Sequence, residues 1–341
     1  MSSAFKRLLQ LALFLGGLVA FFFSLRYAGF DRLGILLPAV SGPGLAVLLV
    51  YPFMCAWDVA GWQALFQREV RGRAGFGTLY FIRLAGEALN NMTPFVDIGG
   101  EFLKVSLVAS RCGITKTAAV VPVVMARTVL FYSEIVLWAV GLVLASGFFA
   151  PEHPWAWALY ATIAISLFLG VTLAWFQRRG FFSSSSGWLR SFEGSRPLLE
   201  KLHVPFREAD QQIASFYKER FGAFGASLFL HFLGWAAGGV EIYFVMNLIG
   251  APVSPAQAVL VEALFQLVKT ASFFIPGNLG AQEAGLAIAA EWMGFHPSVG
   301  VALSLYKRFR QAVWTAVGFA VWGAFKLLPA KSAPTRYNPT S

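Results

Sequence analysis

Long apolar runs are the feature that most restricts how this chain folds. Residues 8–25, 44–57, 155–176 and 223–250 contain almost no charged side chain, and a helix needs about 20 predominantly apolar residues to cross the hydrocarbon core of a bilayer. Charged residues make up 13% of the chain and hydrophobic residues 57%, whereas soluble domains are about 25% charged. The sequence therefore predicts an all-α polytopic membrane protein.

Six full spans are expected, near residues 8–28, 44–66, 117–148, 155–177, 221–249 and 299–328. A single transmembrane domain then covers the chain, with a first half at 1–177, a cytoplasmic loop at 178–220, a second half at 221–328 and a short cytoplasmic tail at 329–341. The first run resembles a signal peptide, but it is too long and no small-x-small cleavage site follows it. Within the loop, Phe206, Ile213, Phe216 and Tyr217 share a helical face, which fits an interfacial helix or a plain linker helix.

The distribution of basic residues predicts how the spans are oriented. Lys and Arg gather around residues 6–7, 68–73 and 178–220, whereas the connections at 151–154 and 251–257 contain neither. This asymmetry is the positive-inside pattern, so we expect both termini in the cytoplasm. The formal net charge of +10 therefore reflects membrane orientation and does not indicate binding to nucleic acid.

Two further segments are apolar but interrupted in the middle. They contain "EALNNMTPFVDIGGEFLK" (87–104) and "KTASFFIPGNLGAQEAGL" (269–286), and in each a proline is followed seven residues later by a glutamate. We expect two broken re-entrant hairpins, one entering from the cytoplasm and one from outside, as an inverted repeat. Two full spans in each segment give the same orientation, and a chance similarity between two Gly/Pro-rich loops is the alternative to a repeat.

Interrupted helices at membrane depth predict a central polar cavity. Lipid cannot satisfy freed backbone groups, a charge at the bilayer centre costs about 2.5–3.5 kcal/mol, and the N-terminal end of a half-helix suits an anionic group. Internal salt bridges that only fix the fold are the alternative, which we favour for Asp58, Glu134 and Glu241. The candidate substrate-binding residues are Glu87, Asn90, Asn91, Pro94, Gly99, Gly100, Glu101, Lys104, Arg127, Lys269, Pro276, Gly277, Asn278, Gly280, Gln282, Glu283, Arg308 and Arg310.

The second break has the more informative sequence. Pro276 is expected to end one half-helix, and the glycines at 277 and 280 let the backbone turn and approach a ligand. Glu283 then opens the next half-helix, where its charge favours the positive end of the dipole. We expect this carboxylate to pair with Arg308 or Arg310 while the cavity is empty.

Motifs typical of enzymes are absent from the sequence. It contains no GxSxG, P-loop, GxGxxG or HExxH. Cys55 and Cys112 form neither a disulfide framework nor a metal-ligand spacing, and His231 stands alone in a span, where packing is expected. We therefore predict a protein that is not an enzyme, with no catalytic residue, metal or cofactor.

The motifs "NNMTPFVDIGGEFLK" and "FFIPGNLGAQEAGL", with the later "LSLYKRFR", resemble the paired signatures of the lysylphosphatidylglycerol synthase transmembrane family, also called flippase-like integral membrane proteins. The stretch "LVKTASFFIPGNLGAQEAG" is similar to members associated with hopanoid biosynthesis. The resemblance covers most of the chain and implies a multi-pass protein of the bacterial inner membrane that moves lipids between leaflets. The chain lacks a soluble aminoacyl-transfer domain, so lipid aminoacylation is not implied, and Lys104 stands where many members have arginine.

Together these features predict binding and transbilayer movement of an amphipathic lipid or lipid-linked molecule, for which a hopanoid or a phospholipid is the candidate, with the head in the cavity and the tails in the bilayer. Since nothing indicates ATP hydrolysis, movement is expected to be downhill or coupled to an ion. Two alternatives stay open: an intramembrane lipid-modifying enzyme, and a non-catalytic membrane partner of a lipid-biosynthesis complex, whose enzymes are the candidate protein partners.

Overall fold

The computed structural model describes residues 34–92, 99–148, 154–180 and 206–327, together with several helical residues between 15 and 26. Within these ranges the secondary structure is helical throughout, with no strand. This confirms the predicted all-α class. The expected first span at 8–28 and the tail at 329–341 lie largely or wholly outside the described residues.

Long helices occupy the other five predicted spans. They are α4 (Val50–Ala64), which follows the short helices α2 (Leu37–Val40) and α3 (Pro43–Val47), and then α8 (Lys116–Ala145), α9 (Pro154–Arg179), α13 (Phe221–Leu248) and α16 (Pro297–Leu327). By length and composition, the segments long and apolar enough to cross a membrane are Pro43–Ala64, Lys116–Ala145, Tyr160–Arg179 and Phe221–Leu248. The 31 residues of α16 reach about 46 Å, but this helix carries several charges in its middle.

The two interrupted segments each form a pair of short helices. They are α6 (Phe76–Met92) with α7 (Gly99–Cys112), and α14 (Pro255–Ala271) with α15 (Ala281–Trp292), the latter pair separated by the one-turn helix η2 (Pro276–Asn278). These helices have 17, 14, 17 and 12 residues, so each is about 18–26 Å long and shorter than the roughly 30 Å hydrocarbon core. The break between α6 and α7 lies outside the described residues.

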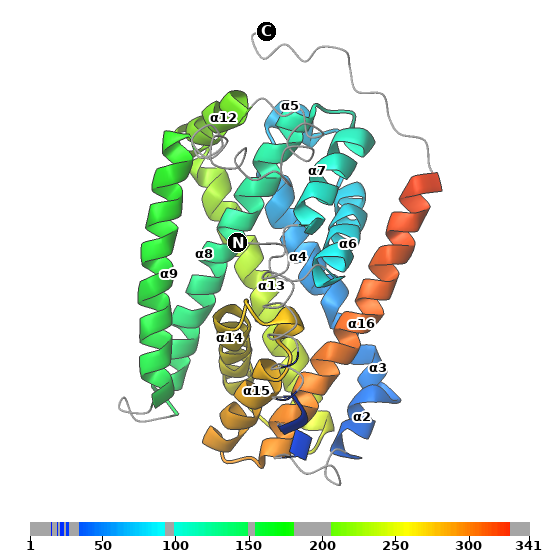
Figure 1. Cartoon of the computed structure of the whole chain (residues 1–341), viewed down its shortest axis with the longest axis vertical. Coiled ribbons are helices and arrows are strands. Elements are labelled where there is room, and N and C mark those ends of the chain that lie inside the picture. Colours follow the sequence, from blue (N-terminus) through cyan, green and yellow to red (C-terminus); the bar gives the residue numbers. More distant parts are fainter. Residues whose placement is uncertain are drawn as a thin grey trace.

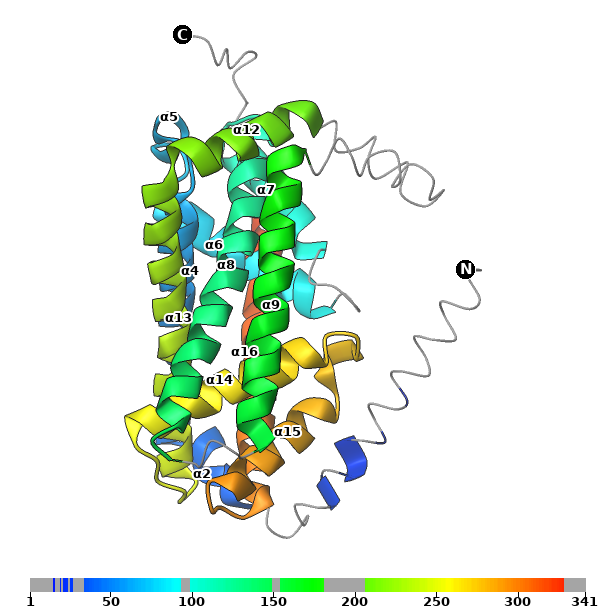
Figure 2. The ribbon, with the colours of Figure 1, turned by 90° about the vertical axis from the view of Figure 1, so that its left-hand side faces the viewer.

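The two pairs enter the molecule from opposite ends. In Figure 1, α6 and α7 occupy the upper half, beside α5 (Arg68–Arg71) and α12 (Phe206–Glu219), whereas α14 and α15 occupy the lower half. Figure 2 shows the same division after a quarter turn. The predicted broken hairpins are therefore present, and they point toward each other along the long axis.

Helix packing repeats between the two halves. Helix α6 packs on α16 as α14 packs on α8, α7 packs on α8 as α15 packs on α16, and α4 packs on α6 as α13 packs on α14. The central helices of the two halves, α4 and α13, pack on each other. The units α4–α6–α7–α8 and α13–α14–α15–α16 thus have matching neighbours in opposite orientation, which is the predicted inverted repeat.

Small residues bring the two central helices close together. A side chain on Gly234 of α13 would meet Asp58 of α4, and one on Gly61 of α4 would meet the ring of His231. Gly238, one turn after Gly234, lies against the carboxylate of Glu262. The sequence GWAAG from Gly234 to Gly238 therefore serves close helix packing, which small-xxx-small spacing favours in membrane helices.

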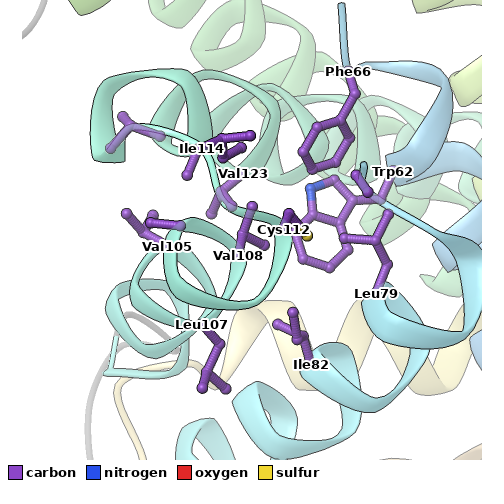
Figure 3. Packing of buried hydrophobic residues seen from close by; sticks show 14 of the residues in the cluster. Trp62, Phe66, Leu79, Ile82, Val105, Leu107, Val108, Cys112, Ile114 and Val123 are labelled. Atoms are coloured by element: carbon purple, nitrogen blue, oxygen red, sulfur yellow. The ribbon is translucent and has the colours of Figure 1, made fainter. Parts of the chain in front are cut away.

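Apolar side chains hold α6 and α7 against the longer helices. Figure 3 shows Trp62 of α4, Phe66 just after that helix and Leu79 of α6 packed with residues of α7, among them Val108 and Cys112. Each of these side chains is buried. Because the cluster fixes α7 between α6 and α8, the polar residues at the start of α7 have a rigid support.

Helix α12 lies across the upper ends of α8 and α9 (Figure 2). Ile213 and Phe216 of this helix are buried, whereas the side chain of Phe206 lies outside the described residues. The hydroxyl of Tyr217 donates to Gln177 Oε1 at 2.6 Å, and burial raises the pKa of this phenol above its usual value. The phenol therefore stays protonated and keeps this contact over the physiological pH range.

Cysteine labelling checks the orientation of the helices. Single cysteines at Lys218 in α12 and at Pro252 before α14, both exposed, should react with a membrane-impermeant reagent only from the cytoplasm and only from outside, respectively. The background replaces Cys55 and Cys112, which are buried free thiols. Labelling of both positions from one side of the membrane would contradict the inverted arrangement.

Candidate functional site

The break between α14 and α15 is a loop of left-handed backbone. Gly277, Asn278 and Gly280 have φ angles of 63°, 51° and 78°, a region that glycine and asparagine adopt most readily. The Asn278 amide donates to Lys269 O at 2.9 Å and to Ser272 Oγ at 2.7 Å. The two glycines therefore make the turn that the sequence predicts.

Glu283 anchors this loop from the first turn of α15. Its side chain is fully buried, Oε2 accepts the Gly280 N–H at 2.8 Å, and both carboxylate oxygens pair with Arg308 of α16. Arg308 also donates to the carbonyl oxygens of Gly277 at 3.1 Å and Asn278 at 3.2 Å. The expected pairing of Glu283 is therefore made with Arg308.

Gln282 strengthens the same contact between α15 and α16. Its Nε2 donates to Ser304 Oγ at 2.9 Å, and that hydroxyl donates to Glu283 Oε1 at 3.0 Å. A Cβ on Gly300 would overlap the backbone of Leu286, so the two helices touch along this seam. Gln282, a candidate binding residue, is buried in this helix contact.

The start of α7 has a corresponding polar arrangement in the first half. Asn90 Oδ1 accepts the Gly100 N–H at 2.7 Å, and Lys104 Nζ donates to Glu101 Oε1 at 2.8 Å. Glu101 and Lys104 are three residues apart, so they share a face of α7 and form an ion pair there. Gly99 begins α7, whereas Pro94 lies outside the described residues.

Gly100 is a packing residue. A Cβ at this position would overlap the carbonyl oxygen of Gly86 and the Asn90 amide. Gly100→Ala should therefore lower the free energy of unfolding by about 1–3 kcal/mol, measured by thermal unfolding of the purified protein. Gly77→Ala on α6, where nothing lies within 4 Å, is the control, and equal stability of the two variants would contradict this packing.

Asn91 connects the first hairpin to the second half of the chain by hydrogen bonds. Its Nδ2 donates to Thr315 Oγ1 at 2.9 Å, and Gln311 Nε2 donates to its Oδ1 at 2.9 Å. Both partners lie on α16. The adjacent candidates Asn90 and Asn91 therefore act in different contacts, one within the hairpin and one across to α16.

A charged cluster formed by α13, α14 and α16 is almost completely inaccessible to solvent. Lys307 Nζ donates to Glu241 Oε2 at 3.2 Å and to Glu262 Oε2 at 2.8 Å, and the side-chain exposure of these three residues is 2%, 0% and 1%. Arg310 also pairs with Glu241, and Gln266 Nε2 donates to Glu262 Oε1 at 2.6 Å. The alternative partner considered for Glu283, Arg310, is therefore engaged elsewhere.

Another charged cluster joins α4, α6 and α13. Arg83 pairs with Asp58 Oδ2, and its Nη1 lies 2.8 Å from Cys55 Sγ. His231 Nδ1 lies 3.1 Å from Asp58 Oδ1. The expectation that His231 stands alone is therefore wrong, because the close crossing of α4 and α13 brings a carboxylate to its ring.

Four helices contribute further charges of opposite sign that interact with one another. Electrostatic interactions link Glu87 to Arg83, Lys104, Arg127 and Lys269. We call the last three, with Glu87, the central charges; they come from α6, α7, α8 and α14. Glu87 is half-buried and makes no hydrogen bond or ion pair within the described part of the chain.

The central charges are connected to Glu134 of α8. Glu134 Oε1 accepts the Thr270 hydroxyl at 2.8 Å, and Glu134 interacts electrostatically with Lys269 and Arg127. Lys269 is exposed, and its ammonium lies 5.9 Å from the centre of the Phe265 ring. The first and second hairpins thus contribute to one polar region.

The structure places the candidate residues in two kinds of contact. Glu101 pairs with Lys104 and Glu283 with Arg308, and Lys104 belongs with Lys269 to the central charges as well. Sequence analysis missed Lys307 and Arg83. The signal for Lys307 was its place in "YKRFR", three residues before Arg310 and therefore on the same face of a helix.

Away from the helix ends, the long helices and the two hairpins carry equal numbers of acidic and basic residues, if charged residues at the last two positions of either end are left out. The acidic members are Asp58, Glu87, Glu101, Glu134, Glu241, Glu262 and Glu283, and the basic members are Arg83, Lys104, Arg127, Lys269, Lys307, Arg308 and Arg310. Across the described ranges, no three His, Cys, Asp or Glu side chains gather as a metal site would require. The arrangement is suited to binding a charged or zwitterionic group by ion pairs and hydrogen bonds.

Comparison with known proteins identifies one matching family. Residues 7–318 match the sequence model described as the lysylphosphatidylglycerol synthase TM region. No curated protein and no solved structure matches the chain.

Proposed function

The chain belongs to the lysylphosphatidylglycerol synthase transmembrane family, and from this premise we propose that it binds an amphipathic membrane lipid and moves the lipid headgroup across the bilayer. The family is one of membrane proteins with a lipid-related function. We place the protein in the cytoplasmic membrane of a bacterium with both termini inside, and we take a hopanoid or a phospholipid as the transported lipid.

The central charges carry this proposal. Three of them belong to the two broken hairpins, which enter from opposite ends (Figure 1), and electrostatic interactions link Glu87 and Lys104 of the first hairpin and Lys269 of the second. Charges inside a membrane are costly, and they characteristically mark substrate pathways. A polar region shared by inverted hairpins is the arrangement in which transporters bind substrate near the midplane.

A headgroup entering this region would meet cations that have few competing partners. Lys269 makes no ion pair among the described residues, and Lys104 is paired only with Glu101, a neighbour on its own helix. A phosphate or hydroxyl group can bind these ammonium groups while the apolar tails stay in the bilayer. Rearrangement of the Glu283–Arg308 pair would then open or close the loop beside the headgroup.

Lipid exchange in reconstituted vesicles tests the central charges. We expect the protein to speed the loss of protection of fluorescent phosphatidylglycerol from a headgroup-specific quencher. Lys269→Gln should slow the exchange by about tenfold, the effect of losing one charge-assisted hydrogen bond of roughly 1.5 kcal/mol. Lys326→Gln, at the exposed end of α16, is the matched control.

Wild-type exchange by Lys269→Gln would contradict a role for the central charges. Mass spectrometry of the same vesicles separates the competing functions. A chemically altered lipid would support the enzyme, whereas no exchange with any tested lipid would support the non-catalytic partner.

A further inference from the structure

A buried set of titratable groups lies beside the central charges and has no part in the transport path proposed above. It comprises Cys55 and Asp58 of α4, Arg83 of α6 and His231 of α13, which we call the Asp58 cluster. The imidazole of His231 is only 4% exposed. Because α4 and α13 are the central helices of the two repeats, a charge that changes here acts on both halves of the chain.

The two nitrogen atoms of His231 have different surroundings. Nδ1 faces Asp58 Oδ1 at 3.1 Å, whereas Nε2 is buried without a hydrogen-bond partner. In a neutral imidazole, the nitrogen facing a carboxylate carries the hydrogen, and the other nitrogen keeps its lone pair. Nε2 is therefore the atom at which this imidazole can take up a proton.

Arg83 has a second carboxylate within reach. It pairs with Asp58, but Glu87 lies four residues further along α6, on the same face. Among the charged groups that act on Glu87, Arg83 has the largest effect. Glu87 makes no ion pair within the described ranges, so it can accept the guanidinium when Asp58 releases it.

The other titratable neighbours keep their partners in this exchange. Tyr51 of α4 lies beside Arg310 of α16, 5.1 Å from its guanidinium carbon. On α13 the next charged residue is Glu241, about 15 Å along the helix and bound to Lys307 and Arg310. Ser133 of α8 accepts the indole N–H of Trp235 of α13 at 3.0 Å. Glu262 of α14, which also lies against α13, is bound to Lys307.

We propose that His231 is the site through which protons are coupled to transport. When Nε2 is protonated, the imidazolium holds Asp58, and Arg83 moves from Asp58 to Glu87. Glu87 is then neutralised, and the central charges present a stronger positive field to an anionic headgroup. Loss of the proton restores the Arg83–Asp58 pair and frees Glu87. This coupling rests on the proposed transport of lipid, but the movement of Arg83 does not require a lipid.

The first test measures exchange of fluorescent phosphatidylglycerol at pH 8 and at pH 5. In the wild type the two rates should differ by at least roughly fivefold, the lower end of typical coupling between two sites. His231→Gln keeps a polar side chain that cannot take up the proton, so its rate should not depend on pH over this range. Wild-type pH dependence in His231→Gln would overturn the proposal.

The second test follows Arg83 directly and is independent of transport. In protein labelled with 15N-arginine and held in nanodiscs, the side-chain resonance of Arg83, assigned with Arg83→Lys, should shift on acidification. The shift should persist in Glu283→Gln and disappear in His231→Gln. It should also disappear in Glu87→Gln, a variant that leaves every member of the Asp58 cluster in place. A resonance insensitive to pH in the wild type, or an unchanged shift in both variants, would refute the coupling even if lipid exchange occurs. A shift without any exchange would instead count against the proposed function alone.

Discussion

Glu283→Gln is expected to abolish lipid exchange while the protein still folds. Glutamine keeps the size of the side chain and can still accept the Gly280 N–H, but it removes the charge that holds Arg308. Arg308 retains its hydrogen bonds to the carbonyl oxygens of Gly277 and Asn278, so the loop keeps its shape. Because hydrogen bonds to charged groups contribute about 1.5–3 kcal/mol, we expect exchange to fall by at least roughly tenfold.

Glu291→Gln on the same helix is the matched control, because that carboxylate is exposed near the end of α15. Exchange is measured in vesicles with equal amounts of folded protein, as judged by size-exclusion chromatography. Equal rates for Glu283→Gln and the wild type would show that the loop is only a structural bend.

Lys307→Met is expected to cause the largest loss of stability. The substitution leaves Glu241 and Glu262 facing each other, both inaccessible and only one of them still bound to a cation, Arg310. Removing one member of a buried ion pair costs about 3–5 kcal/mol. The apparent unfolding temperature in detergent should therefore fall sharply, and the yield of folded protein should fall with it.

Two variants separate the lost charge from the lost packing. Lys307→Met with Glu262→Gln removes the unpaired carboxylate and should recover part of the stability. Lys326→Met, at the exposed end of the same helix, should unfold like the wild type. If the double variant is as unstable as Lys307→Met, the ammonium group is not what stabilises this cluster.

The spans and the broken hairpins could be predicted from the sequence because they depend on local chemistry. Apolar length fixes where a helix crosses, and prolines with glycines fix where it breaks. The Glu101–Lys104 pair was also local, since residues three apart share a helical face. These features need no knowledge of the neighbouring helices.

The partners of the other charges depend on how α16 is rotated. Arg308 and Arg310 are two residues apart, so they point about 200° away from each other on a helix and cannot share a carboxylate easily. In the structure, Arg308 pairs with Glu283 and Arg310 pairs with Glu241. Sequence analysis named both arginines as possible partners of Glu283. It could not tell which one forms the pair, because that depends on how α15 and α16 pack against each other.

The Asp58–His231 contact was missed for a different reason. The two residues are far apart in the chain, and they meet only because Gly61 and Gly234 allow α4 and α13 to approach closely. The small-xxx-small pattern in α13 indicated a close helix contact without naming the partner helix. Pairing of α4 with α13 follows from the inverted repeat, which local patterns alone do not define.

The most direct test of lipid transport varies the number of protein molecules per vesicle. Purified wild-type protein is reconstituted at increasing protein-to-lipid ratios, and the fraction of fluorescent phosphatidylglycerol reached by an external quencher is measured. The proposed transport predicts that this fraction rises from about one half toward completeness as each vesicle gains a protein, while lipid composition stays unchanged by mass spectrometry. A fraction that stays at the value of protein-free vesicles at every ratio, for phospholipid and hopanoid probes alike, would contradict it.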